Sequence, residues 1–268
     1  MKRSLFSNHF PVPKYLKPLY LGVSFSESNI KAVSFDKSEK VPRVKSLVVP
    51  LEKGAIVEGK IINPEEIITK LSIIKKDMGF DFVHFTIPDE LTYIFSTKIP
   101  FVRGMNMEEA VAFTIEENIP ITMQDSVFDY IPYNIEEGEN GLSVSVLVSA
   151  CTELELNNYI DSLNKSGFEV LGGVNESQAI ANALIKKNSK DTFFIVHARK
   201  ERIGTYLVKE GIVHFSTVTT VSKGDYQEQF MSEYEKFVEY SAKYSLRLEE
   251  EYLQESIFHK WFDKLFSK

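Results

Sequence analysis

The sequence predicts an α/β fold with an internal duplication. Three β-rich runs within residues 19–52 have the layout of an antiparallel meander, and residues 192–218 repeat that layout with a turn at 209–211. Between the two sets lie predicted helices and a small block in the order strand, helix, strand, strand. A meander that recurs after such an interval is typical of a duplicated α/β protein.

Composition places the chain among ordinary globular proteins. It has 268 residues, of which 43% are hydrophobic and 26% charged, so we expect one large or two small domains. The net charge is -7. An acidic chain is a poor binder of the phosphate backbone, which excludes nucleic acid as an expected partner.

The single cysteine and the N-terminal segment bear on the compartment. Cys151 has no second cysteine for an internal disulfide, which fits a reducing environment. Residues 1–18 contain Lys2, Arg3, Lys14 and Lys17 but no acid and no continuous apolar run, so we predict an extended basic arm and no signal peptide. We therefore expect a cytoplasmic chain.

The first meander is followed by a well-marked helix over residues 64–78. Asn63 stands at the N-cap, Pro64 at the first position and Glu66 three residues after the cap, which predicts a capping box, and Gly79 ends the helix. Its apolar face consists of Ile67, Leu71, Ile74 and Met78.

The small block comprises a strand at 92–100, a helix from Asn106 to before Pro120 and strands near 126–135 and 142–150. Thr152 then caps a helix that ends at Gly167, and a short helix is expected at 175–186.

The C-terminal part predicts a long helix over 225–248 and an amphipathic end at 256–268. The apolar face of this end could contact a membrane interface, and the alternative is a terminal helix folded onto the core. The predicted membrane-contact residues are Phe258, Trp261, Phe262, Leu265 and Phe266.

No catalytic motif is present. The five histidines are scattered without metal-ligand spacing, and the chain has neither a GxSxG elbow nor a Walker A sequence. Cys151 has no local nucleophile signature, and adjacent acids such as Glu116 and Glu117 point about 100° apart on a helix. We expect neither a metal site nor a catalytic site.

Five segments together resemble the PilM family of type IV pilus assembly proteins, over about residues 19–221. They are LYLGVSFSESNIKAV, KGAIVEGKIINPEEI, TIPDELTYIFSTKIP, EEAVAFTIEENIPI and SVFDY. The resemblance implies an actin-like, ribonuclease H-like duplicated fold with a small inserted α+β subdomain and a truncated second half. It divides the chain into a basic arm (1–18), a first actin-like subdomain (19–90 with 168–188), an inserted subdomain (91–167), a second actin-like subdomain (189–250) and an amphipathic tail (251–268).

The resemblance also shows where this chain departs from actin-like ATPases, in which an aspartate on each of two phosphate loops organises Mg²⁺. In the first loop, Ser24 and Ser26 replace the aspartate and glycine, and Glu27 adds a negative charge. In the second loop, His197 and Arg199 replace them. Without these carboxylates a hydrated Mg²⁺ has no anionic ligand, so the resemblance implies a pseudo-ATPase with no cofactor, residual ATP binding being the alternative.

A basic cluster follows the second loop. Arg199, Lys200 and Arg202 could attract a phosphate, and the alternative is a solvated turn between strands.

The function implied by the resemblance is a non-enzymatic scaffold of the type IV pilus inner-membrane platform. It binds the cytoplasmic tail of a single-pass membrane protein, on a face built from residues 92–120 and 142–163, and it could also contact the pilus motor ATPase and the inner face of the membrane. Two alternatives are an actin-like ATPase and a cytoplasmic component of a type II secretion platform.

Overall fold

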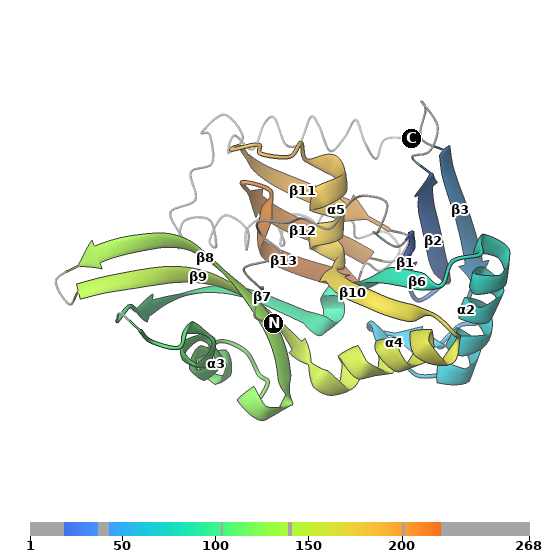
Figure 1. Cartoon of the computed structure of the whole chain (residues 1–268), viewed down its shortest axis with the longest axis horizontal. Coiled ribbons are helices and arrows are strands. Elements are labelled where there is room, and N and C mark those ends of the chain that lie inside the picture. The colour runs from blue at the N-terminus through green and yellow to red at the C-terminus, as the bar shows by residue number, and fades with distance from the viewer. Residues whose placement is uncertain (1–18, 37–42, 103, 139–140, 200–201, 221–268) are drawn as a thin grey trace. The chain divides into compact units, whose positions relative to one another are not determined.

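The computed structural model describes residues 19–36, 43–102, 104–138, 141–199 and 202–220. They divide into two compact units, one of residues 19–88 and 154–174 and the other of residues 89–153 and 175–220 (Figure 1). The predicted basic arm, the long helix at 225–248 and the tail at 251–268 lie outside the described residues. The subdomain boundaries taken from the resemblance stay a prediction.

The first unit contains a five-stranded sheet in the order β10-β6-β1-β2-β3. β1 to β3 form the predicted antiparallel meander, and β6 runs parallel to β1. The strands are β1 (Tyr20–Phe25), β2 (Asn29–Asp36), β3 (Arg43–Pro50), β6 (Phe82–Ile87) and β10 (Glu169–Asn175).

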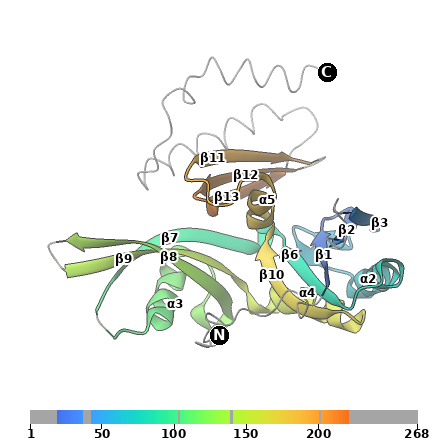
Figure 2. The same ribbon diagram turned by 45° about the horizontal axis from the view of Figure 1, so that its top comes forward.

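Helices α2 (Pro64–Met78) and α4 (Glu153–Lys165) lie next to each other beside this sheet (Figure 2). The Lys75 ammonium on α2 donates to the carbonyl oxygen of Gly167, just after α4, over 2.6 Å. The predicted apolar face of α2 is confirmed, because Ile67, Leu71 and Ile74 are fully buried. Burial of this stripe holds a helix that propensity alone would leave marginal.

The ends of α2 follow the prediction except in one bond. The Asn63 side chain accepts from the backbone N–H of Glu66 over 3.2 Å, and Gly79 takes the left-handed conformation with φ 75°. The prediction of the reciprocal bond of the capping box, from the Asn63 backbone N–H to the Glu66 carboxylate, is wrong. The Glu66 carboxylate accepts from the backbone N–H of Glu52 over 2.7 Å, so it fastens the segment before the helix to its first turn.

Tyr159 of α4 occupies the centre of the first unit. Its ring is fully buried and makes an edge contact with Phe25, with ring centroids 4.9 Å apart, and it stacks near Phe85. Its hydroxyl donates to the carbonyl oxygen of Gly59, in the turn between the short strands β4 (Ile56–Val57) and β5 (Lys60–Ile61). Glu58 and Gly59 both have positive φ there, 49° and 77°, as a two-residue hairpin requires.

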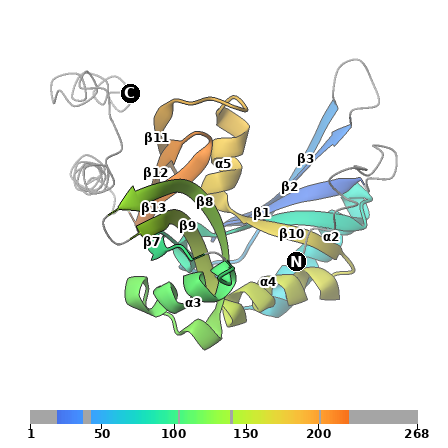
Figure 3. The ribbon, with the colours of Figure 1, turned by 60° about the vertical axis from the view of Figure 1, so that its left-hand side comes forward.

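The second unit contains the predicted strand-helix-strand-strand block. Its sheet has the order β7-β9-β8, with all pairs antiparallel, and α3 packs on one face of it (Figure 3). The elements are β7 (Thr92–Pro100), α3 (Met107–Asn118), a 3₁₀ turn η3 (Met123–Asp125), β8 (Ser126–Gly138) and β9 (Gly141–Thr152).

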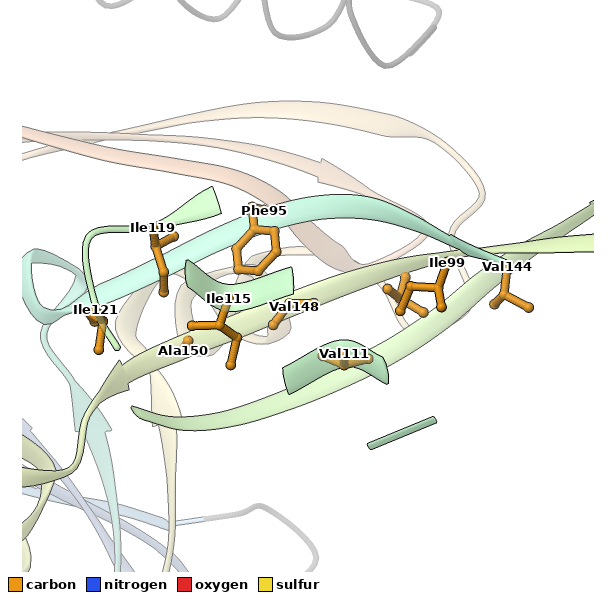
Figure 4. Packing of buried hydrophobic residues seen from close by; sticks show 10 residues of the cluster. Phe95, Ile99, Val111, Ile115, Ile119, Ile121, Val144, Val148 and Ala150 are labelled. Carbon is orange, nitrogen blue, oxygen red and sulfur yellow. The ribbon is translucent and has the colours of Figure 1, made fainter. Parts of the chain in front are cut away.

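A continuous apolar cluster joins α3 to this sheet (Figure 4). Val111 and Ile115 of α3 face alternate residues of β9, which include Val144 and Val148. Apolar residues four positions apart on the helix thus pack against apolar residues two positions apart on the strand. This packing explains why the helix lies as a layer on the sheet.

The predicted second meander is also confirmed. β11 (Thr192–Ala198), β12 (Arg202–Lys209) and β13 (Ile212–Thr220) form a three-stranded antiparallel sheet, and Glu210 and Gly211 make its predicted turn with positive φ. Helix α5 (Glu176–Leu184), which ends two residues sooner than expected, packs Ala181 against Tyr206 and Val208. A 3₁₀ turn, η2 (Asp89–Leu91), begins this unit.

None of the helices in the described ranges has the length and apolar character needed to cross a membrane.

The Tyr159 hydroxyl gives a direct test of the first unit's core. Tyr159→Phe should lower the free energy of unfolding by about 1–2 kcal/mol, because the buried carbonyl of Gly59 loses its donor while the ring packing is kept. Urea unfolding followed by circular dichroism measures this change. Tyr20→Phe, at an exposed tyrosine of β1, should change stability by less than about 0.5 kcal/mol, and equal effects of the two variants would contradict the assignment.

Candidate functional site

The first of the two predicted loops is a tight hairpin between β1 and β2. Ser24 lies within β1, opposite Lys31 of β2, and Ser26 closes the turn by accepting from the Asn29 N–H and donating its hydroxyl to the Asn29 carbonyl over 2.9 Å. Both serines therefore serve the hairpin. Neither supplies the anionic oxygen that a hydrated Mg²⁺ prefers.

The carboxylate of Glu27 at the tip of this hairpin has a structural partner. It accepts from the backbone N–H of Glu58 over 2.9 Å, at the β4–β5 turn. The negative charge that the sequence placed in the first loop therefore binds the protein's own backbone, as an anion binds an exposed N–H group.

The second loop is the turn between β11 and β12. His197 lies on β11 opposite Gly204, and the Arg199 N–H donates to the Arg202 carbonyl over 2.7 Å. The side chains of both arginines turn back toward the protein, where Arg199 pairs with Glu176 of α5 and Arg202 pairs with Glu90 of η2. The prediction of a solvated turn is wrong for Arg202, which is buried.

These ion pairs satisfy a simple requirement. A guanidinium is charged at every physiological pH, so burying it without an opposite charge is costly. Glu176 and Glu90 supply the opposite charges from two separate segments of the chain. The charges of Arg199 and Arg202 are thereby balanced by acids of the same chain.

Asp89 lies beside these pairs and is itself almost fully buried. One of its oxygens accepts from the backbone N–H of Ser177 over 3.0 Å and from the Ser177 hydroxyl over 2.8 Å. Burial raises the pKa of Asp89 to about 7, and the neighbouring carboxylate of Glu176 adds to this rise. The phenol of Tyr206 faces the same carboxyl, and burial raises the pKa of Tyr206 as well.

Gly204 makes room for this arrangement. A methyl group on its Cα would collide with the hydroxyl and ring of Tyr206. The glycine at this position of β12 is therefore a packing requirement for Tyr206.

The buried ionic cluster, as we call Asp89, Glu90, Glu176, Ser177, Arg199, Arg202 and Tyr206, was only partly foreseen from the sequence. Arg199 and Arg202 were identified, and the acids that hold them were missed. One available signal was position, because Asp89 and Glu90 follow the buried strand β6, and Glu176 follows β10. Polar residues at such strand ends often converge.

Metal ligands and a reactive thiol were the remaining candidates for chemistry among the described residues. These residues contain no group of three or more histidine, cysteine, aspartate or glutamate side chains able to hold a metal ion. The Cys151 thiol is buried, and burial raises its pKa to about 11, so it stays protonated at neutral pH. The predicted membrane-contact residues, Phe258 to Phe266, lie outside the described part of the chain.

The pKa of Asp89 makes the stability of the second unit dependent on pH. A carboxyl whose pKa rises on folding stabilises the fold below its unfolded pKa of about 4, and that contribution is lost as the pH rises through about 7. Asp89→Asn keeps an oxygen for Ser177 and removes the titration. Between pH 5 and 7 the wild type should lose up to about 1.4 kcal/mol per pH unit relative to this variant in urea unfolding.

Asp129→Asn, at an exposed aspartate of β8, is the matched control and should follow the wild-type pH profile. Parallel profiles of the wild type and Asp89→Asn would show that Asp89 does not titrate in this range.

Comparisons with known proteins agree with this geometry. The family model described as type IV pilus assembly protein PilM matches residues 22–252. A comparison with curated proteins gave no match.

Two solved structures are similar to this chain. One is a PilM-PilN type IV pilus biogenesis complex, with 20% identity and a TM-score of 0.63, covering 78% of this chain and 63% of the other. The second is the cytoplasmic domain of EpsL, an inner membrane component of the type II secretion system of Vibrio cholerae, with 13% identity, a TM-score of 0.52 and coverage of 75% and 71%.

This chain thus spans less than two thirds of the chain in the pilus complex. The fold is the actin-like α/β fold with an inserted α+β block that the resemblance implied. Because the family model covers most of the sequence, the chain belongs to the PilM family of type IV pilus assembly proteins.

Proposed function

We propose that this chain is a non-enzymatic scaffold of the type IV pilus inner-membrane platform, which binds the cytoplasmic tail of a membrane-anchored pilus protein. Membership of the PilM family supports a role in type IV pilus assembly. The likeness to a complex that contains a PilN chain supports a partner of this kind. A cytoplasmic position at the inner face of the membrane and a contact with the pilus motor are parts of the same proposal.

The proposed lack of catalysis is based on the residues of two loops, the β1–β2 hairpin and the β11–β12 turn. Ser24 and His197 stand where actin-like ATPases have a carboxylate, and Arg199 is already paired with Glu176. A phosphate arriving at the β11–β12 turn would have to displace two internal carboxylates, which would be left buried without a partner. We therefore propose that the scaffold works without a nucleotide cofactor.

Strand β8 carries the proposal for partner binding. Among the described strands it pairs with β9 alone and forms one edge of the three-stranded sheet, and its residues 131–137 are all exposed. Ile131 and Ile135 add apolar surface along this edge, and the half-exposed Tyr133 ring makes an edge contact with His214 of β13. An edge strand with unpaired backbone groups and apolar side chains is a ready template for an extended peptide.

This surface refines the face expected from the sequence. The expected face joined residues 92–120 to 142–163 and left out β8, which lies between those ranges. β9 is the central strand and is paired on both sides, and β7 packs against β13. Of the three strands, β8 therefore has the most accessible edge.

The two alternatives have less support. The likeness to the type II secretion protein is at 13% identity and indicates a shared fold. An ATPase would require the loop carboxylates that Ser24 and His197 replace.

Titration with a labelled peptide tests both the binding of the partner's tail and its independence of nucleotide. The probe is the cytoplasmic tail of the single-pass pilus protein encoded beside this chain. It should bind saturably, with a Kd that changes by less than about twofold when Mg-ATP is added, since no switch couples the two. Binding that requires Mg-ATP would overturn the nucleotide-independent scaffold, and no binding in either condition would overturn the partner.

A charge on the β8 edge tests the binding surface. Ile131→Lys should weaken tail binding by about tenfold or more, because it places a charge among the apolar contacts of an added strand. Fluorescence anisotropy measures the Kd. Val48→Lys is the matched control, because Val48 is an exposed β-branched residue on β3, the edge strand of the other sheet. Similar losses in both variants would exclude β8 as the specific edge.

A further inference from the structure

The inserted block of this chain is strongly acidic. Residues 92–152 contain nine Asp and Glu residues against two Lys and Arg residues, a net charge of -7. This equals the net charge of the whole sequence, so the remaining residues are neutral in sum. The block that is inserted between β6 and α4 therefore attracts cations.

Helix α3 of this block has an outer face with an unusual composition. Its buried side is marked by Val111 and Ile115. Phe113 lies about 160° from each of them around the helix, so it points away from the sheet. Its side chain is 71% exposed.

Three exposed glutamates surround this phenylalanine. Glu109, Glu116 and Glu117 each lie within about 60° of Phe113 around the helix, and one turn or less along it. We call Glu109, Phe113, Glu116 and Glu117 the α3 face. The η3 turn contacts this side of α3 through Glu116, and all four side chains of the face are exposed.

The carboxylates of the α3 face are not neutralised by the described residues of the protein. None of the three forms an ion pair with another described side chain, and Lys98 of the same block is paired with Glu136. Glu116 accepts one backbone N–H, from Met123, over 2.8 Å. A lone exposed phenylalanine is ordinary on a protein surface, but one set among three uncompensated acids has the chemistry of a docking site.

We propose that the α3 face binds a Lys- or Arg-rich peptide segment that carries a bulky apolar side chain. Cationic side chains would pair with the glutamates and lie over the Phe113 ring, and their aliphatic stems would cover its edge. The surface repels phosphate groups, which disfavours nucleic acid and anionic lipid as occupants.

The occupant is the basic part of the membrane-anchored partner's cytoplasmic tail, and in this respect the inference rests on the proposed function. Segments on the cytoplasmic side of a spanning helix carry an excess of Lys and Arg. Their positive charge complements the negative charge of the α3 face. The same tail would then be held at two places on one block, by its extended part at β8 and by its basic part at α3.

A model peptide tests the α3 face without the natural tail. The probe is a fluorescein-labelled decapeptide with five lysines, one central tryptophan and glycines elsewhere, titrated against the full chain by fluorescence anisotropy at about 20 and 300 mM salt. Wild-type binding should weaken at least tenfold at the higher salt. Phe113→Ala should weaken binding at low salt by about three- to tenfold.

The triple variant Glu109→Gln, Glu116→Gln, Glu117→Gln should lose most of the salt dependence, and the amide oxygen that replaces the Glu116 carboxylate can still accept the Met123 N–H. Phe35→Ala, at an exposed phenylalanine of β2, and the pair Glu65→Gln, Asp77→Asn, at exposed acids of α2, are the matched controls and should bind as the wild type does. Losses in the controls equal to those in the α3 variants would overturn the site.

The natural tail separates this inference from the proposed function. Tail binding that Ile131→Lys weakens and the α3 variants leave unchanged would overturn the α3 inference and keep the scaffold. A tail that binds no form of the chain, while the lysine peptide binds the α3 face, would remove the proposed partner and with it the assigned occupant.

Two other occupants have distinct signatures. If the lysine peptide binds only after Lys2, Arg3, Lys14 and Lys17 are all changed to Gln in the full chain, the chain's own basic arm holds the face and the assignment to the partner is overturned. It is equally overturned if the wild type self-associates in sedimentation and Phe113→Ala abolishes that association.

Discussion

The pairing of buried Arg202 and partly buried Arg199 with two glutamates is the interaction on which the second unit depends. Arg199 and Arg202 flank one turn, while Glu90 and Glu176 come from the two places where the chain enters this unit from the other. A buried guanidinium cannot lose its charge, so each arginine holds its glutamate in place. Asp89 and Ser177 add a hydrogen-bonded link between the same two entry segments.

This arrangement fits the proposed function as a scaffold. In a nucleotide switch, an anionic ligand brings cations together, and its loss lets them separate. Here the anions belong to the protein and cannot leave. Arg199 and Arg202 are therefore held by groups of the same chain.

Features decided by neighbouring residues were predictable from the sequence. The Asn63 cap, the Gly79 stop, the apolar stripe of α2 and the Glu210–Gly211 turn all depend on residues a few positions apart. The capping box failed in its second half because the Glu52 N–H, from outside the helix, competes for Glu66. The partners of Arg199 and Arg202 were out of reach, since Glu176 is 23 positions and Glu90 is 112 positions away and no local periodicity links them.

The buried ionic cluster has a consequence for the order in which the chain can fold during synthesis. Asp89 and Glu90 leave the ribosome first, Glu176 and Ser177 follow, and the arginines and Tyr206 come last. Until β12 has been made, the carboxyl groups of Asp89, Glu90 and Glu176 have neither arginine as a partner. Burying them at that stage would be costly, so the second unit cannot fold before β12 is present. All described strands of the first unit have been made by residue 175, so this unit can form before the arginines of the second unit have been made.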